Sequence, residues 1–450
     1  MAAVTRRRFS LALFLALAAC GRAPEPSANP QPRPATAATG SYAPVAVGRE
    51  IAAFYARRGN RPLWVTKSGL RPGAEQALRR ISEARYDGLD PAAYGWPDIA
   101  RAVEGARTGE AGALAHLELL LSRGFSAYVR DLRTPRRNRM VLAEPGLAPE
   151  PSSPTDVLQA LAAAPSLSDG VSQAVAMNPL YSALRRGYAR WAEHGARGDE
   201  RLVRANLDRA RAIPPAGGRY IVVDTASARL WMIDGARVQG PMRVIVGKRG
   251  METPMLASRI THAVLNPYWN MPPDLAQGRA KRVVREGPGL IARERLQILS
   301  DWSDSARPIS ASAVNWKAVA AGRESLRLRQ LPGGANVMGA MKFMMANRLG
   351  IYLHDFPDKA LFARADRRLS SGCVRLSDYR RLAEWLFRGR APTPRGGAPE
   401  QRADLPEPVP VYITYLTVLP GGPEGLTFQP DSYGRDQAGG GPSPVRAKED

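Results

Sequence analysis

The sequence predicts an α+β protein in which a helical N-terminal scaffold is followed by a mostly-β domain with an inserted capping subdomain. Apolar residues recur at helical spacing between residues 50 and 211. From Arg219 onward the spacing changes to alternation, which is typical of half-buried strands. A basic, proline-containing stretch at 266–334 then interrupts the strands and is too long for a plain loop.

The composition excludes several classes of protein. The chain has 450 residues, of which 44% are apolar and 23% charged, so it is globular rather than disordered. Its two cysteines, Cys20 and Cys373, exclude a disulfide framework and a cysteine-rich zinc site. The formal net charge of +23 comes mainly from arginine and favours an anionic partner: nucleic acid, a membrane surface or an acidic polymer.

The first twenty residues (1–20) have the pattern of a lipoprotein signal peptide. Arginines at positions 6–8 precede an apolar run at 11–19, which is shorter than the ~20 residues that a membrane-spanning helix needs. Leu17–Cys20 has the pattern of a lipobox, so we expect Cys20 to be lipidated and to become the first residue of the mature protein. The alternative is an ordinary cleaved signal. The arginines leave both the Sec and the Tat export routes open.

Export determines how the charge is interpreted. A membrane-anchored lipoprotein in the periplasm does not meet DNA, so we expect no nucleic-acid partner and an anionic envelope polymer or lipid surface instead. Gly21 after the lipidated cysteine favours the outer membrane. Residues 21–48 are rich in proline and alanine and are predicted to be an extended linker, and residues 437–450 a disordered tail.

Helices are predicted through residues 49–212, the scaffold domain. Asp90 stands before Pro91 and is expected to cap the element that follows. A proline-rich break is expected at 144–154. The segments with helical spacing are 51–55, 74–81, 114–121, 181–191 and 200–211.

Strands are predicted through residues 217–420, the second domain. Asp234-Gly235 between two alternating segments is typical of a hairpin turn. Residues 266–334 are expected to fold as a capping subdomain over one face. The predicted strands are 220–224, 229–233, 238–247, 260–265, 343–345, 351–353 and 411–418.

One short window carries residues suited to nucleophilic chemistry. His354 lies at the end of an apolar strand, and Cys373 follows nineteen residues later, after Ser370, Ser371 and Gly372. A thiol without a disulfide partner in an oxidising compartment is unusual unless it is buried or reactive. Arg375 and the serines beside Cys373 suit a polar pocket better than a core.

Acyl transfer is the chemistry that these residues suit. We expect Cys373 to attack an amide carbonyl, with His354 generating the thiolate or pairing with it, and later protonating the leaving amine. Backbone N–H groups around Gly372 and Cys373 are expected to face the developing oxyanion. A structural cysteine and histidine are the alternative, and spacing alone leaves both open.

The window resembles the catalytic motif of the L,D-transpeptidases of the YkuD fold, in particular their YcbB-like branch. That motif is a histidine and then, after about fifteen to twenty residues, Ser/Thr-His-Gly-Cys-x-Arg/Asn. Here His354 precedes Ser370-Ser371-Gly372-Cys373-Val374-Arg375. Ser371 replaces the second histidine, a departure that the branch shares. Similar segments occur across roughly 50–436 and include Val246–Lys248, Thr253-Pro254, Asn266–Asn270, Tyr352–Asp355, Asn206–Arg209 and Tyr433–Asp436.

The resemblance implies a substrate, the peptide stem of peptidoglycan. Cys373 would form a thioester with a tetrapeptide stem, release D-Ala and pass the acyl group to an amine of another stem, making a 3→3 cross-link. Carbapenems would acylate the same cysteine, and no metal or organic cofactor would be needed. The substrate-binding residues would be Arg375, Ser371, Tyr352, Trp269 and Tyr268. Core packing is the alternative for the aromatic residues, and stabilisation of the turn is the alternative for Arg375.

Three classes of function remain open at this stage. The first is the transpeptidase. The second is a hydrolase on the same scaffold, either an L,D-carboxypeptidase or an amidase that releases wall-bound protein, because both share the acyl-enzyme and differ only in the acceptor. The third is a non-catalytic wall-binding lipoprotein. The segment Trp191–Arg204 is too short for the small wall-binding module that the branch commonly carries there.

Overall fold

The structure is a computed structural model that describes residues 44–108, 110, 112–136, 139–195, 198–215 and 217–437. A helical region precedes a β-rich region within these residues, which confirms the predicted α+β class. The expected export signal with Cys20 lies outside the described residues, as do residues 21–43 of the expected linker and 438–450 of the expected tail. No helix in the described part of the chain is long and apolar enough to cross a membrane.

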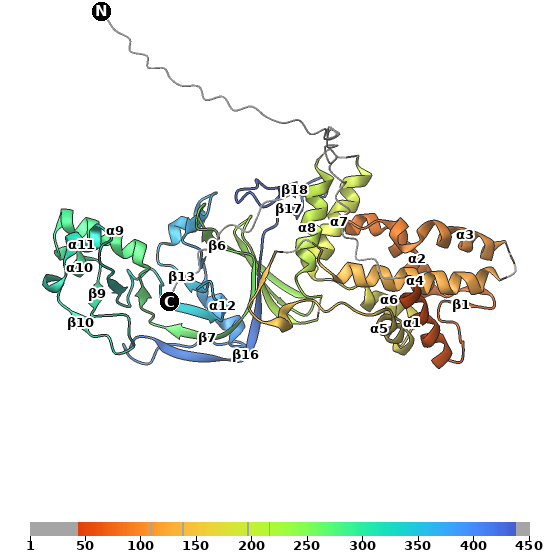
Figure 1. Cartoon of the computed structure of the whole chain (residues 1–450), viewed down its shortest axis with the longest axis horizontal. Helices are drawn as coiled ribbons and strands as arrows, with labels where there is room; N and C mark the ends of the chain where they lie inside the picture. The colour runs from red at the N-terminus through yellow and green to blue at the C-terminus, as the bar shows by residue number, and fades with distance from the viewer. Residues whose placement is uncertain are drawn as a thin grey trace, which may run out of the picture. The chain divides into compact units, whose positions relative to one another are not determined.

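Eight α-helices make up most of the described N-terminal region, and α2, α3 and α4 run side by side (Figure 1). They are α1 (Pro44–Arg57), α2 (Pro72–Ser82), α3 (Trp96–Arg107), α4 (Ala113–Arg133), α5 (Pro154–Ala163), α6 (Leu167–Ala174), α7 (Pro179–Glu193) and α8 (Glu200–Arg211). Short elements join them: the hairpin β1 (Val65–Thr66) and β2 (Gly69–Leu70), and the 3₁₀ turns η1 (Ala84–Asp87), η2 (Pro91–Tyr94) and η3 (Pro145–Leu147). Asp90 accepts the N–H of Ala92 and so caps η2.

The start of α1 differs from the sequence prediction. Residues 44–48 were assigned to the extended linker, but α1 begins at Pro44. Proline is tolerated in the first turn of a helix because the N–H that it lacks has no intrahelical partner there. The apolar residues of α1, among them Ile51 and Phe54, then pack into the core of the helical region.

A buried carboxylate organises that core. Glu118 on α4 accepts the backbone N–H groups of Leu63, Trp64 and Val65, at 2.5, 2.9 and 3.0 Å, and the hydroxyl of Tyr55. Burying a charge costs free energy unless hydrogen bonds replace its hydration. These four donors replace the hydration of the Glu118 carboxylate. Their hydrogen bonds also fix Leu63–Val65 against α4.

The β-rich region is built on a ring of hydrogen-bonded strands. The order runs β12–β13–β15–β6–β5–β4–β16–β7, and β7 pairs in turn with β12. A core of alternating residues fills one face of these strands, including Ile221, Val246, Phe343 and Leu353. The strands are β4 (Arg219–Asp224), β5 (Arg229–Asp234), β6 (Arg237–Gly247), β7 (Leu256–Leu265), β12 (Met341–Met345), β13 (Leu353–Asp355), β15 (Val374–Leu376) and β16 (Gln401–Thr414).

Further elements complete this region. β14 (Arg368–Ser370) pairs with β6, and α12 (Tyr379–Leu386) contributes Leu382 and Leu386 to the core. The hairpin β17 (Val418–Pro420) and β18 (Leu426–Phe428) packs on α7 so closely that a Cβ at Gly187 would lie 2.4 Å from the carbonyl oxygen of Gly425. The hairpin therefore joins the last strands to the helical region. The 3₁₀ turn η5 (Lys359–Ala363) follows β13.

Residues 266–334 have a core and a sheet of their own. The strand order is β10–β9–β11–β8, and α9, α10 and α11 lie with these strands (Figure 1). Ala280, Ile298 and Leu328 are among the buried residues of this core. The elements are β8 (Trp269–Asn270), α9 (Pro273–Glu286), α10 (Gly289–Arg293), β9 (Leu296–Leu299), β10 (Pro308–Ile309), η4 (Ala311–Ala313), α11 (Trp316–Ala320) and β11 (Arg327–Gln330).

Several strand boundaries differ from those predicted. The strand expected at 351–353 begins at Leu353, because the side chain of Asn347 binds the backbone N–H and carbonyl of Ile351. The strand expected at 411–418 is the end of β16, which begins at Gln401 and stops at Thr414. Just before the expected proline-rich break at 144–154, an unpredicted strand, β3 (Val141–Leu142), pairs with β7 and carries part of the helical region onto the sheet.

The Glu118 cluster gives a stability prediction. Glu118→Ala removes one acceptor from three buried N–H groups and a hydroxyl, and each orphaned donor costs about 1–3 kcal/mol. We expect the free energy of unfolding to fall by about 3 kcal/mol or more in chemical denaturation. The neighbouring Leu119, which is 54% exposed, provides the control: Leu119→Ala should change it by no more than about 0.5 kcal/mol. Equal effects of the two variants would contradict this account.

Candidate active site

The pleat of two adjacent strands brings the predicted nucleophile and base to one face. β13 and β15 pair in parallel, with Leu353 opposite Val374 and His354 opposite Arg375. Leu353 and Val374 point into the core, so His354 and Arg375 point to the other face. Cys373 directly precedes Val374, so the alternation of the strand predicts that its side chain turns to the same outer face as that of His354.

Cys373 carries a reduced thiol and is partly exposed to solvent. Its Sγ lies 3.6 Å from the carbonyl oxygen of Gly350, and the hydroxyl of Tyr352 is also within hydrogen-bonding reach. Tyr352 packs its ring against His354, with 5.7 Å between the ring centroids. The thiol, the phenol and the imidazole therefore form one contiguous group.

The environment of His354 keeps its imidazole neutral. The residue is 1% exposed, and Nδ1 lies 2.6 Å from the carbonyl oxygen of Asp355, which can only accept a hydrogen bond. Nδ1 therefore carries the proton and Nε2 the lone pair. Burial, followed by the charges of Arg375 and Lys342, lowers the pKa of His354 to about 3. A neutral imidazole favours the general-base role over a preformed ion pair.

Ser370 fixes the turn that presents the thiol. Its buried Oγ donates to the carbonyl oxygen of Cys373 at 2.6 Å and accepts the N–H of Gly372 at 3.2 Å. Gly372 has φ +116°, a conformation that residues with a Cβ rarely adopt. This conformation and the hydrogen bond to Ser370 give the turn its shape, and the oxyanion role expected for the backbone N–H groups around Gly372 and Cys373 stays a prediction.

Thr253 fixes the same turn from the other side. Its hydroxyl accepts the N–H of Gly247 at 2.8 Å and donates to the carbonyl oxygen of Gly372 at 2.7 Å. Lys248 N–H donates to the carbonyl oxygen of Ser370 at 2.9 Å. A side chain at Gly247 would collide with the carbonyl oxygen of Met251, 2.1 Å from the ideal Cβ. The end of β6 and the turn before β15 are thus held as one unit.

Comparison with known proteins identifies this region. Residues 218–411 match the model of the L,D-transpeptidase catalytic domain (YkuD), and residues 49–187 match that of the Scaffold domain. The chain carries an L,D-transpeptidase catalytic domain. A curated Haemophilus influenzae protein named "Putative L,D-transpeptidase" is 30% identical over 239 residues, which are 52% of this chain and 47% of that protein. The chain therefore spans about half the length of this curated relative.

Solved structures were also matched. An L,D-transpeptidase from Mycobacterium smegmatis is 12% identical, with a TM-score of 0.21, over 43% of this chain and 58% of that chain. The match to the YkuD model covers β4 to most of β16, and so includes both Cys373 and His354.

Of the predicted substrate-binding residues of the L,D-transpeptidase domain, Arg375, Tyr352 and Ser371 lie at the thiol. The guanidinium of Arg375 stacks on Phe356 at 4.1 Å, and its Nε is buried without a hydrogen-bond partner. Ser371 is exposed in the turn beside Cys373.

The two predicted aromatic residues of the capping subdomain are held by that subdomain. Trp269 packs against its core, and Tyr268 lies beneath the guanidinium of Arg329, 3.9 Å from its ring centroid. Trp269 is therefore packed within residues 266–334, and the role in substrate binding that the resemblance implies for it stays a prediction. The positioning roles of Ser370 and Thr253 were not predicted, because their partners are backbone groups that only folding brings near.

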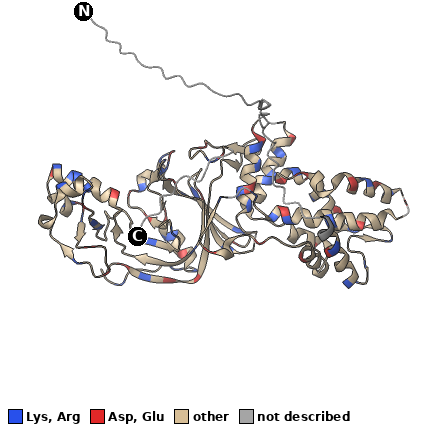
Figure 2. Ribbon diagram, viewed as in Figure 1, with Lys and Arg blue, Asp and Glu red and all other residues tan. Residues whose placement is uncertain are grey.

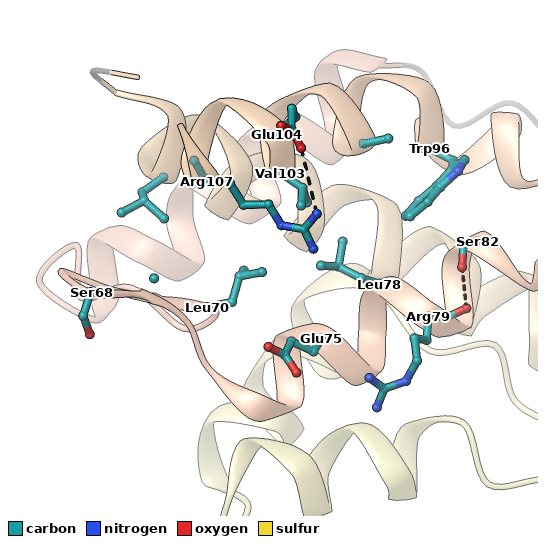
Figure 3. A pocket seen from close by; sticks show the side chains of 14 residues that line it. Ser68, Leu70, Glu75, Leu78, Arg79, Ser82, Trp96, Val103, Glu104 and Arg107 are labelled. Atoms are coloured by element: carbon teal, nitrogen blue, oxygen red, sulfur yellow. Dashed lines mark hydrogen bonds and ion pairs between the residues drawn. The ribbon is translucent and has the colours of Figure 1, made fainter. Parts of the chain in front are cut away.

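A cavity of about 770 Å³ lies outside the catalytic domain (Figure 3). It opens between the β1–β2 hairpin and helices α2 and α3, and all its lining residues fall between Ser68 and Leu114. Leu78, Val103 and Trp96 form apolar walls, and Glu104 and Arg107 pair at 3.9 Å on one side. None of the predicted site residues lines it, so it is separate from the thiol site.

The buried state of His354 gives a pH prediction. Between about pH 6.5 and pH 3 the unfolded chain binds a proton on this imidazole that the folded protein does not, so the free energy of unfolding falls as the pH is lowered. His354→Asn should remove this contribution. Calorimetric unfolding between pH 7 and pH 4 should show a smaller loss of stability for the variant than for the unaltered protein. Parallel curves would contradict a buried, neutral His354.

Proposed function

We propose that this protein is a peptidoglycan L,D-transpeptidase that works through a thioester on Cys373. The observation that carries the proposal is the group formed by the thiol of Cys373, the hydroxyl of Tyr352 and the neutral imidazole of His354, in which Tyr352 contacts both of the other residues. Membership of the catalytic domain in the YkuD family supports the substrate class. The assignment to the YcbB-like branch, made from the sequence, is part of the same proposal.

The first half-reaction acylates the enzyme. His354 Nε2 accepts the thiol proton while Sγ of Cys373 attacks the carbonyl carbon between the diamino acid and D-Ala of a tetrapeptide stem. The C–N bond breaks as the imidazolium returns its proton to the amine of D-Ala, which leaves. The stem is then held as a thioester.

The second half-reaction transfers the stem. His354 takes a proton from the side-chain amine of another stem, which attacks the thioester carbonyl and forms an amide, while the thiol recovers its proton. The product is a 3→3 cross-link. Water in place of the amine would make the protein a carboxypeptidase, so the acceptor decides between the two reactions. No residue of this scheme requires a metal or an organic cofactor.

Charge supports an anionic polymer as the wider partner. Lys and Arg occur along both helices and strands, interspersed with Asp and Glu (Figure 2), so the positive excess is distributed over the described elements. Distributed charge attracts a polyanion at long range, in a way that salt screens. Arg375 beside the thiol adds a local site for a stem carboxylate.

The sequence of the first twenty residues supports a location. We propose that Cys20 is lipidated and anchors the protein to a membrane on the periplasmic side, with the outer membrane favoured. The proline-rich residues after it would let the catalytic domain reach the wall from that anchor.

Replacement of the nucleophile tests the mechanism. Cys373→Ala should abolish turnover and the covalent adduct of about one carbapenem per chain, because no other side chain of the site can form the thioester. Intact-protein mass spectrometry after incubation with a carbapenem reads out the adduct. An adduct that persists on another residue would show that the nucleophile is misassigned.

The product assay decides among the functions. Purified protein incubated with disaccharide-tetrapeptides should give cross-linked dimers and free D-Ala, identified by mass spectrometry. Tripeptides without dimers would instead establish an L,D-carboxypeptidase, and no change in the substrate would contradict catalysis on stems.

The anchor is tested in cells. Cys20→Ser should release the exported protein from the membrane fraction, because a thioether-linked lipid cannot form on serine, and it should leave catalysis intact. Fractionation followed by immunoblotting measures this. Retention of the variant in the membrane fraction would contradict the lipid anchor.

A further inference from the structure

A short C-terminal segment crosses the back of the catalytic turn. Residues 431–436, here named the C-terminal strap, follow β18. The hydroxyl of Tyr433 donates to the carbonyl oxygen of Gly247, and Nη2 of Arg435 donates to that of Thr253 at 3.0 Å. Gly247 and Thr253 are the residues that hold the Cys373 turn. The strap is therefore hydrogen-bonded directly to the two residues that support this turn.

The other end of the strap is fixed by the helical region. Arg209 on α8 pairs with Asp436, 2.7 Å between Nη1 and Oδ1, and donates to the carbonyl oxygen of Arg435 at 2.6 Å. Both partners of this ion pair are about nine-tenths buried. Arg209 also donates to the carbonyl oxygen of Tyr415 at 3.1 Å. Removing one partner would leave the other buried and unpaired, so the contact holds the strap firmly.

The strap is also rigid within itself. Asp431 accepts the hydroxyl of Tyr415 and the backbone N–H groups of Arg435 and Asp436, all between 2.7 and 2.9 Å. Tyr433 stacks on Tyr415 with 5.3 Å between the ring centroids and 13° between the planes. These contacts make the strap rigid, so a displacement at one end also moves the other end.

A continuous path of hydrogen bonds therefore joins α8 to the nucleophile. It runs from Arg209 through Arg435 to Thr253, and the hydroxyl of Thr253 reaches the carbonyl oxygen of Gly372, next to Cys373. A second branch passes from Tyr433 to Gly247. We propose that the C-terminal strap positions the Cys373 turn and that α8 of the helical region holds the strap in register.

The residues of the strap act through Gly247 and Thr253 and are positioning residues. Their effect is on the placement of Sγ relative to His354, where a displacement of about 1 Å is enough to lower a rate by up to ~10². The inference rests on the proposed function only where turnover of stem peptides is the measurement. The reactivity of the Cys373 thiol reports on the same placement without any peptidoglycan substrate.

Tyr433→Phe is the sharpest variant, because it keeps the ring that stacks on Tyr415 and removes only the hydroxyl. Ser432→Ala is the matched control, since its exposed neighbouring hydroxyl touches only Pro430 within the same segment. Alkylation of Cys373 by iodoacetamide is followed in the full chain by mass spectrometry of the peptide that contains it. We expect an about ten-fold slower rate for Tyr433→Phe and an unchanged rate for Ser432→Ala.

A second variant tests the contact between the strap and Arg209. It keeps the proposal testable if Tyr433→Phe fails to fold. Asp436→Asn keeps the side-chain shape and removes the charge that pairs with Arg209. It should also slow the alkylation of Cys373, while the pH at which the protein is most stable stays the same. Hydrogen exchange should show faster exchange at backbone amides 370–374 in both variants. If both fold and alkylate like the unaltered protein, the strap does not position the turn.

Turnover separates this inference from the proposed function. With stem peptides, both variants should lower kcat while KM changes less than two-fold, because the strap touches no substrate. A protein that makes no product from stems but shows slowed alkylation in the variants would refute the proposed function and retain the strap. Normal turnover with normal alkylation would refute the strap and retain the function.

Discussion

The hydroxyl of Thr253 is the contact on which the arrangement of the site depends. It lies between the end of β6 and the turn before β15, and it satisfies one backbone group on each side. Gly247 and Gly372 permit this close approach, because a Cβ at Gly247 would collide with its neighbours and Gly372 needs a positive φ. Loss of this hydroxyl would leave two buried backbone groups unpaired and free the turn that carries the thiol.

The second constraint is electrostatic. His354 is buried between two register partners that carry positive charge, Lys342 on β12 and Arg375 on β15. Desolvation and these charges lower the pKa of His354, so the sheet holds a neutral imidazole against the ring of Tyr352, whose hydroxyl reaches the thiol of Cys373. Lys342 is itself paired with Glu400 at 3.1 Å, whereas Arg375 has a buried Nε without a hydrogen-bond partner. The charge of Arg375 acts on Cys373 as well as on His354.

The helical region is more than a spacer for the catalytic domain. β3 pairs with β7, α7 packs on the β17–β18 hairpin, and Arg209 of α8 holds the last described residues. This continuity gives the proposed strap a fixed support, and it explains why residues after the matched catalytic domain belong to the folded unit.

The sequence alone determined the fold class and most helices and strands, and it predicted the Cys–His pair, because these depend on periodicity and on motifs within a few residues. It could not determine the start of α1, the length of β16 or the engagement of Gly372 by Ser370, which depend on partners that are distant in the chain. The tertiary structure alone decided that His354 is neutral and that Thr253 and the strap hold the turn. Burial and backbone hydrogen bonds between remote segments arise only when the strands pair.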